Sequence, residues 1–477
     1  MEPTLMGPTL GDVLRDRRGE DWLIGPSSPD FWQRLDNLRP VLAAYQKSCA
    51  TEGADVLITE ADPLQFLIAC LAAWSEDCVV VLANPRWGQQ ERQQVTDLVN
   101  PDWNTPTAPG LGTYPCQVSD AAPGQILIPT GGSSGQIKFA VHTWETLMAS
   151  VSGFCAHFGV ETVHAYCVLP LFHVSGLMQV LRVLATGGQL AIQPYGDLKR
   201  GAQLGLPPGG FLSLVPTQLQ DLLAWEGNVP WLRSFRAVLL GGAPAGRSLL
   251  DAAQAAQIPV ALTYGMTETA AQVATLRPEE FLAGHRNSGR PLPHVRISIL
   301  DDGGRPQPLG EVGRVTVQTH ALAWGYLGKW DGESGLAVGS AHPTGQSTAA
   351  VLATDDIGYF DDSGYLHIVG RRSTKLITGG ENVFPEEVEA ALLSVEGVQD
   401  GCVVGLPCDR WGQRLCALVV LTYPARLSDL PAVLSPLLAP YKRPKRWILI
   451  SAMPRTAQGK LSRPQALTLA QQILGTG

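Results

Sequence analysis

The stretch IPTGGSSGQIK, residues 128–138, decides how the rest of the chain is interpreted. The apolar residues 126–128 predict a strand that runs into a loop of glycines and serines, and Lys138 closes this loop. Glycines let backbone N–H groups crowd around an anion, and the hydroxyl and ammonium groups add donors. The loop is not a Walker A motif, because Gln136 and Ile137 separate its last glycine from the lysine. The loop predicts a polyphosphate cradle, that is, a backbone loop that binds phosphate groups. Taken alone, the same residues are also compatible with an ordinary turn.

Length and composition indicate a globular protein with more than one domain. The 477 residues exceed what one hydrophobic core usually holds, and 45% hydrophobic with 16% charged residues is ordinary for a soluble protein. A net charge of −8 argues against a broad nucleic-acid-binding surface, so an anion site must be built locally. The N-terminus has no apolar signal core, and no apolar run approaches the roughly 18 residues that span a bilayer. We expect small molecules as partners, without nucleic acid and without membrane insertion.

The nine cysteines are scattered and show neither the CxxC nor the Cys/His spacing of a zinc site. Most have apolar neighbours, which indicates reduced core thiols and a cytoplasmic protein. The sequence leaves the formation of a homo-oligomer open.

Alternating apolar runs and helix-like stretches predict a parallel sheet in the first part of the chain. Residues 56–59 and 79–83 are continuous apolar strands, separated by the helix-like stretch 63–74. Residues 101–125 are rich in Pro, Gly and Thr and indicate a long surface connection. Residues 331–350 are of low complexity, and neither structure nor function is assigned to them.

The second half of the chain changes character twice. Residues 295–300 and 313–318 alternate around turn signals, which predicts an antiparallel, barrel-like subdomain. A second, smaller unit of strands and helices follows. We therefore expect an α/β fold with a large N-terminal domain, residues 1–371, that combines parallel-sheet layers with a β-barrel-like subdomain, and a small mobile C-terminal α/β domain, residues 372–477.

Two predicted strands end in residues suited to ligand contacts, as expected at the carboxyl edge of an open α/β sheet. The strand 165–169 is followed by PLFHVSGL, residues 170–177, in which His173 is either a ligand contact or a satisfied core histidine. A later strand runs into YGMTE, residues 264–268, which offers an aromatic face, a hydroxyl and a carboxylate. These groups suit a planar base and a metal-bound phosphate. Glu268 is then a hard ligand for Mg²⁺ or, in the plainer interpretation, a helix N-terminal carboxylate.

Two basic residues are candidates whose role the local sequence does not decide. Arg182 lies in the apolar helix-like stretch 177–185. Because a buried arginine is costly unless paired, it must either reach the surface or meet an anion. Lys460 lies on a glycine-bearing loop near the end of the chain and is by itself an ordinary surface lysine.

These segments resemble, in order and spacing, the acyl-CoA synthetase, adenylation-domain and luciferase superfamily of adenylate-forming enzymes. The similar segments are TGGSSGQIK (130–138), PLFHVSGL (170–177), LLGGAP (239–244), YGMTE (264–268), SGRPLP (288–293), TDD (354–356), GRR (370–372), GGENVFP (379–385), VVGLPCDRWGQ (403–413) and Lys460. Ten segments in the family's order leave little room for chance. The first hundred residues are similar only in their pattern of strands and helices.

The resemblance implies ATP, Mg²⁺ and CoA as cofactors, and a reaction in which a carboxylate is adenylated and then transferred to a thiol. The residues implied in ATP binding are Thr130, Ser133, Ser134, Gly135, Lys138, Gly242, Ala243, Pro244, Tyr264, Gly265, Asp356 and Arg371. Those implied in catalysis are Lys460, His173, Thr267 and Glu268, with Glu268 as the Mg²⁺ ligand. The acid would contact His173, Ser175, Gly176, Arg182 and Gly265, and CoA would contact Gly379, Gly380 and Glu381. Rotation of the small domain near Arg372 and Ser373 would bring these CoA contacts to the thiol channel.

Within the superfamily, the chain is most similar to ligases for an acid with a benzene ring and two carboxylates. The segments that carry this similarity are PLFHVSGL followed by Arg182, GRRS and GGENVFP. Arg182 and His173 are then the candidates that neutralise the carboxylate that is not activated. Three alternatives stay open: a ligase for another aryl or medium-chain acid, a stand-alone adenylation domain, and an ATP-binding module without catalysis. An ATP-binding module without catalysis would be expected to lack Lys460 or Glu268, and both residues are present.

Overall fold

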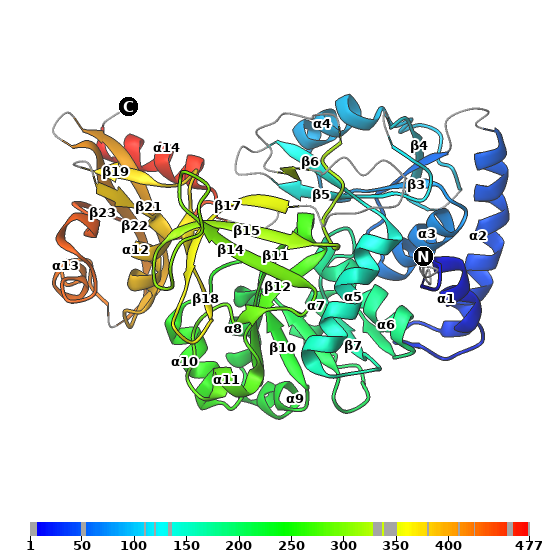
Figure 1. The fold of residues 1–477 in the computed structure, drawn as a ribbon, viewed down its shortest axis with the longest axis horizontal. Helices are drawn as coiled ribbons and strands as arrows, with labels where there is room; N and C mark the ends of the chain where they lie inside the picture. Colours follow the sequence, from blue (N-terminus) through cyan, green and yellow to red (C-terminus); the bar gives the residue numbers. More distant parts are fainter. Residues whose placement is uncertain are drawn as a thin grey trace.

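The computed structural model describes residues 7–48, 54–108, 111–118, 121–131, 136–327, 336–337, 351–378, 381–408, 411–423, 425–455 and 461–475. Within these residues the strands form four sheets. The sheet nearest the C-terminus lies at one end of the molecule, and helix α2 (Ser28–Ser48) lies at the other (Figure 1).

The largest sheet carries both of the predicted ligand-binding strand ends. Its strands are β1 (Leu23–Ile24), β7 (Ala165–Cys167), β8 (Leu190–Ile192), β9 (Phe211–Leu214), β10 (Ala237–Leu240), β11 (Val260–Met266), β12 (Ala271–Thr275) and β13 (Arg290–Pro291). They lie in the order β1-β8-β7-β9-β10-β11-β12-β13. The strands from β1 to β11 in this order are parallel, and β12 and β13 are antiparallel additions. PLFHVSGL and YGMTE therefore lie at the same edge of one sheet, as predicted.

A second sheet carries the glycine-rich loop. Its strands are β2 (Asp55–Ile58), β3 (Val79–Leu82), β4 (Thr113–Cys116), β5 (Ile126–Gly131) and β6 (Ile137–His142), in the order β4-β2-β3-β5-β6. β2, β3 and β5 are parallel, which confirms the predicted pattern. The prediction of a plain connection over residues 101–125 is wrong at β4, which pairs antiparallel with β2. The edge position of β4 tolerates Pro115, which has no N–H to donate.

Helices α3 (Pro63–Ser75), α5 (Trp144–Phe158) and α6 (Val174–Thr186) pack with both sheets in one hydrophobic core. Asp62 caps α3 by accepting a hydrogen bond from the Gln65 N–H, and Pro63 occupies its first turn. α6 begins before the predicted Leu177 because Gly176 lets its first turn approach the preceding chain closely. A Cβ on Gly176 would lie 2.2 Å from the carbonyl oxygen of Pro170. This close approach fixes the start of α6 at the carboxyl edge of β7.

The other helices of the described chain are short and mostly lie on the outer faces of the sheets (Figure 1). They are α1 (Leu10–Asp16), α4 (Gln89–Val99), α7 (Tyr195–Lys199), α8 (Pro216–Leu223), η1 (Glu226–Asn228), α9 (Val229–Arg233), α10 (Arg247–Ala255), η2 (Thr267–Thr269), α11 (Pro278–Leu282), α12 (Pro385–Leu393), α13 (Leu430–Leu434), η3 (Pro440–Lys442) and α14 (Arg463–Leu474). None of the described helices is both long and apolar enough to cross a bilayer.

The predicted antiparallel subdomain is a five-stranded sheet. It contains β14 (Val295–Leu300), β15 (Gly313–Thr319), β16 (Leu336–Ala337), β17 (Val351–Phe360) and β18 (Leu366–Arg371), with the order β14-β15-β17-β16 and β18 paired to β17. β16 is the described part of the low-complexity stretch 331–350, whose other residues lie outside the described chain. The turn between β17 and β18 uses Gly364 with φ +76°, a conformation that favours glycine.

The C-terminal part builds a separate sheet with cores of its own. Its strands are β19 (Leu376–Thr378), β20 (Glu381–Val383), β21 (Val398–Cys408), β22 (Gly412–Leu421) and β23 (Arg446–Leu449), with the order β20-β19-β22-β21 and β23 paired to β22. α12 and α14 contact β21. The buried clusters on the faces of this sheet draw only on residues from 376 onward. This large-plus-small arrangement confirms the expected α/β fold class.

Candidate active site

The glycine-rich loop connects the paired strands β5 and β6. Thr130 lies opposite Lys138 in this hairpin, so the two residues flank the loop. The predicted cradle residues Ser133, Ser134 and Gly135 lie outside the described chain. This pairing therefore places Thr130 and Lys138 at the two ends of the loop that is predicted to bind polyphosphate.

Tyr326 contacts two of the predicted residues, Lys138 of β6 and Glu268 of the turn η2 between β11 and β12. The ammonium nitrogen of Lys138 lies 5.1 Å from the centre of the Tyr326 ring. The Tyr326 hydroxyl donates a hydrogen bond to the Glu268 carboxylate. Lys138, predicted to bind phosphate, and Glu268, predicted to bind Mg²⁺, thus contact the same tyrosine. Tyr326 is not among the residues predicted from the sequence, because its neighbours in the chain form no recognised motif.

Glu268 lies in η2, a single 3-10 turn between β11 and β12, and is 8% exposed. Glu268 is thus an acidic residue in the first turn of a short helix, as the plainer interpretation expects, and the chain enters β12 immediately after this turn. The described residues contain no cluster of three or more His, Cys, Asp or Glu that could hold a metal. A lone carboxylate suits Mg²⁺, which commonly binds one or two carboxylates together with waters and substrate phosphates.

His142, the last residue of β6, holds the backbone of the predicted phosphate-binding turn. Its Nε2 lies 2.8 Å from the carbonyl oxygen of Thr267, and its Nδ1 lies 3.0 Å from the Thr146 hydroxyl. Because a carbonyl can only accept, Nε2 carries the proton and donates it. Burial lowers the pKa of His142 to about 4, so the ring is neutral. No local pattern indicates this contact, because Thr267 lies 125 positions away.

The same resemblance implies that Tyr264 flanks the adenine and that Asp356 and Arg371 bind the ribose hydroxyls, and these three side chains also meet. The Tyr264 hydroxyl donates to Asp356 at 2.7 Å, and Arg371 Nε lies 3.2 Å from the other Asp356 oxygen. Burial and the neighbouring Asp356 carboxylate raise the pKa of Tyr264, so the phenol stays protonated. The chain after β10 exposes three of the residues implied in ATP binding, Gly242, Ala243 and Pro244. Gly242 has φ +79°, a conformation that favours glycine. The Asp356 carboxylate is therefore fixed by two side chains at a predicted ribose position.

The predicted acid-binding residues surround the start of α6 and the end of β11. His173 is the N-cap residue of α6, and its ring centre lies 4.5 Å from that of Phe172. The Ser175 carbonyl accepts a hydrogen bond from the Gln179 amide. Gly265 pairs with Gln272 of β12, and a Cβ on Gly265 would lie 1.9 Å from the Ala271 carbonyl oxygen. Only glycine fits there, because any side chain would collide with the backbone of β12.

Of the two options drawn from the sequence, the one in which Arg182 reaches the surface is wrong, and its contacts within the described chain include no protein carboxylate. It is 3% exposed, donates to the Gln272 side-chain oxygen at 2.7 Å, and lies 4.0 Å from the centre of the Phe154 ring. Its Nε is buried without a hydrogen-bond partner. Burial lowers the pKa of the guanidinium to about 10, which leaves it charged at neutral pH. The described contacts of this cation therefore include no negative charge to offset its burial.

Four further predicted residues belong to the C-terminal part. Glu381 is exposed at the start of β20, the edge strand of the C-terminal sheet. Lys460, Gly379 and Gly380 lie outside the described chain. Their roles therefore rest on the sequence alone.

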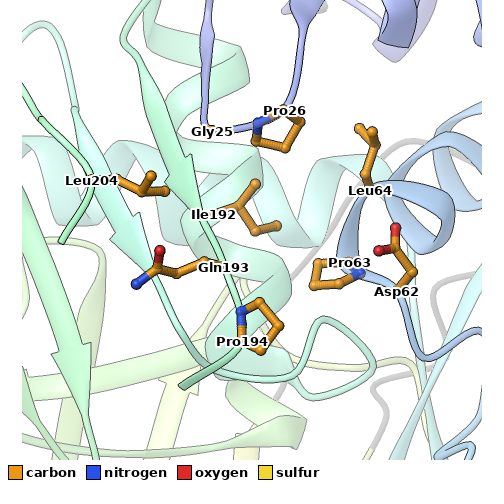
Figure 2. A pocket seen from close by; sticks show the side chains of 9 residues that line it. All are labelled: Gly25, Pro26, Asp62, Pro63, Leu64, Ile192, Gln193, Pro194 and Leu204. Atoms are coloured by element: carbon orange, nitrogen blue, oxygen red, sulfur yellow. The ribbon is translucent and has the colours of Figure 1, made fainter. Parts of the chain in front are cut away.

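A pocket of about 210 Å³ lies apart from these residues, where the ends of β1 and β8 meet the start of α3 (Figure 2). Its lining consists of Gly25, Pro26, Asp62, Pro63, Leu64, Ile192, Gln193, Pro194 and Leu204, and none of these is a predicted site residue. The Gln193 amide already donates to the Ala202 carbonyl. A mostly apolar lining with one carboxylate is unsuited to a phosphate, so the nucleotide is not assigned to this pocket.

The chain matches two family models. The model described as AMP-binding enzyme matches residues 111–327, and the model described as AMP-binding enzyme C-terminal domain matches residues 387–460. The chain belongs to the AMP-binding enzyme family, and its resemblance to the adenylate-forming superfamily is confirmed.

Particular relatives carry more specific names. The chain is 33% identical over 354 residues to a 2-succinylbenzoate–CoA ligase of Enterococcus faecalis, an alignment that covers 74% of this chain and 71% of the relative. It is 36% identical over 342 residues to a ligase of the same name from a Geobacillus species, with 70% and 67% covered. Among solved structures, the o-succinylbenzoate-CoA synthetase (MenE) of Bacillus subtilis in complex with its acyl-adenylate intermediate matches with a TM-score of 0.78 and 25% identity, over 96% of this chain and 98% of that chain.

Proposed function

We propose that the protein is a 2-succinylbenzoate–CoA ligase, also called o-succinylbenzoate–CoA ligase, of menaquinone or phylloquinone biosynthesis. In the first half-reaction, a carboxylate oxygen of the acid attacks the α-phosphorus of ATP, and the bond to pyrophosphate breaks. In the second, the thiol of CoA attacks the acyl carbon and AMP leaves. The products are o-succinylbenzoyl-CoA, AMP and pyrophosphate.

The observation that carries the choice of acid is the uncompensated charge of Arg182. Within the described chain, the contacts of this buried guanidinium are an amide oxygen and an aromatic ring, which leaves an electrostatic deficit that an anionic ligand can offset. The substrate named by the relatives has two carboxylates, and only one of them is activated. The second carboxylate, on the benzene ring, would pair with Arg182. Gln272 connects this charge to the site, because it pairs with Gly265 across β11 and β12.

The nucleotide would be held by groups from all parts of the N-terminal fold. Lys138 and the loop 130–135 would bind the β- and γ-phosphates, Thr267 the α-phosphate, and Asp356 the ribose. Glu268 would hold Mg²⁺, which neutralises phosphate charge during adenylation. His142 and Tyr326 keep the Thr267 carbonyl and the Glu268 carboxylate in place. Lys460 would stabilise the charge that develops between the acid and the α-phosphate.

The domain boundary belongs to the same proposal. We place it between residues 371 and 372, where β18 ends and the chain continues toward the separate C-terminal sheet. Rotation there would exchange Lys460 for the segment 379–381 at the acyl group, so one site would serve both half-reactions. A reaction that consumes ATP and CoA is expected in the cytoplasm.

Arg182→Ala tests the proposal. A charge-assisted hydrogen bond is worth about 1.5 to 3 kcal/mol, so the KM for o-succinylbenzoate should rise roughly ten- to a hundredfold. The KM for 4-oxo-4-phenylbutanoate, which lacks the ring carboxylate, should change little. Both constants come from pyrophosphate release at saturating ATP.

Arg286→Ala is a matched control. Arg286 also lies over a phenylalanine ring, at 4.6 Å from the centre of Phe281, and also donates to a glutamine, Gln254. It differs in having a carboxylate partner, Asp251 at 3.3 Å. Arg286→Ala should leave both KM values unchanged. Equal losses for the two acids in Arg182→Ala would show that Arg182 serves packing and would remove the support for the dicarboxylate.

A further inference from the structure

His294 has two ring nitrogens that are buried and without a hydrogen-bond partner, Nδ1 and Nε2. An imidazole always has at least one N–H to donate, and leaving it unmade in a buried position is costly. A native protein usually gives such a group a partner, and a bound ligand is one source of it. His294 thus requires an explanation that the contacts within the described chain do not provide.

The fold makes room for this ring at a particular place. Gly153 lies in the interior of α5, and a Cβ there would come within 1.7 Å of His294 Nδ1. Glycine in a helix interior is less stable than alanine, so its presence there needs a reason. Here it allows the imidazole to lie directly against the helix backbone. Any larger residue at position 153 would displace the ring.

Arg182 packs against the same turn of α5, and its own Nε also has no hydrogen-bond partner. Burial and the charge of Arg182 lower the pKa of His294 to about 4, so the imidazole is a neutral donor within the electrostatic influence of the guanidinium. The neighbouring residue Phe154 follows Gly153 on α5 and contacts Arg182 through its ring. Both groups are therefore held by the same turn of α5.

The strand register brings these groups to the predicted acid site. Pro291 pairs with Ala274, and the Leu292 N–H donates to the Val273 carbonyl, so the chain runs alongside β12 toward its first residues. Pro293 and His294 follow in a turn that is closed by a hydrogen bond from the Val295 N–H to the Leu292 carbonyl, so His294 lies where the chain leaves β12. Gln272, the acceptor for Arg182, lies at this same end of β12 opposite Gly265.

We propose that His294 is a specificity-determining residue that donates a hydrogen bond to the substrate carboxylate paired with Arg182. This inference rests on the proposed function and deepens it, because it adds a second donor for the carboxylate that is not activated. A neutral N–H satisfies a second carboxylate lone pair without burying another positive charge. An acid without that carboxylate leaves both donors unsatisfied, which is how the pair rejects it.

The test compares His294→Leu, which removes the donor, with His294→Gln, which retains an N–H donor on a shorter side chain. For o-succinylbenzoate, His294→Leu should raise the KM and the Kd measured by calorimetry without ATP about tenfold, as expected for one lost hydrogen bond. His294→Gln should recover part of this loss. The kcat, and the KM for 4-oxo-4-phenylbutanoate, should stay near the wild-type values.

His285→Leu is the control, because His285 is exposed and its ring contacts Tyr365 rather than the site. In the double variant with Arg182→Ala, the effect of His294→Leu should shrink, since both residues serve one carboxylate. An unchanged Kd for o-succinylbenzoate in His294→Leu, or equal losses for both acids, overturns the inference. If the wild type turns over o-succinylbenzoate and the variants match it, only this inference falls. If the wild type does not turn it over, the proposed function falls as well.

Discussion

His142 provides a quantitative test, because one buried contact controls both stability and the position of Thr267. Burial lowers its pKa from 6.5 to about 4. Between these values the unfolded chain binds a proton that the folded chain excludes. The stabilising contribution is therefore fully present above pH 6.5 and is lost as the pH falls toward 4. From the two pKa values, acidification from pH 7 to pH 5 costs about 2 kcal/mol through this one residue.

The variant His142→Gln removes the titration and retains an amide N–H that can donate to the Thr267 carbonyl. Urea unfolding followed by tryptophan fluorescence at pH 7 and pH 5 should show that the variant loses about 2 kcal/mol less than the wild type on acidification. His142→Ala, which leaves the carbonyl without its donor, should also lower the rate of adenylation by roughly tenfold or more at pH 7.5, and the Gln variant should retain most of this rate. Equal acid sensitivity of the wild type and His142→Gln would refute the assignment of a neutral buried imidazole.

Two further predictions concern the two half-reactions. Lys460→Ala should lower adenylation by about a hundredfold or more, because an electrostatic donor at the transition state is lost, and should leave thioester formation from supplied acyl-adenylate largely intact. Both rates come from single-turnover assays, and equal losses would contradict a role confined to one step. Gly380→Leu should do the reverse, because a side chain there would obstruct CoA without touching ATP. Normal thioester formation in this variant would remove the CoA assignment.

Local patterns were sufficient to predict the elements that carry the site. The runs before PLFHVSGL and YGMTE are short and continuously apolar, as buried parallel strands are, and they form β7 and β11. β4 was missed because an edge strand of four residues with a proline carries little periodic signal. α6 begins earlier than expected because the close packing of Gly176 against Pro170 is a tertiary effect.

The contacts within the site depended on long-range pairing that no local pattern contains. Tyr326 lies 58 positions from Glu268, which it contacts, and His142 is similarly remote from Thr267. The sequence identified Arg182 as an arginine that needs an anion, but Gln272 and Phe154 became visible as its neighbours only once β12 and α5 were placed. The sequence therefore supplied the chemical groups, and the topology supplied their partners.

The most direct measurement is the identification of the product formed from o-succinylbenzoate, ATP, Mg²⁺ and CoA by the wild-type protein. The proposed function predicts o-succinylbenzoyl-CoA, detected by mass spectrometry, in equal amount to the AMP formed. It also predicts that 4-oxo-4-phenylbutanoate and simple aryl or medium-chain acids give lower kcat/KM values. Preference for one of those monocarboxylates, or pyrophosphate release without any CoA thioester, would contradict it.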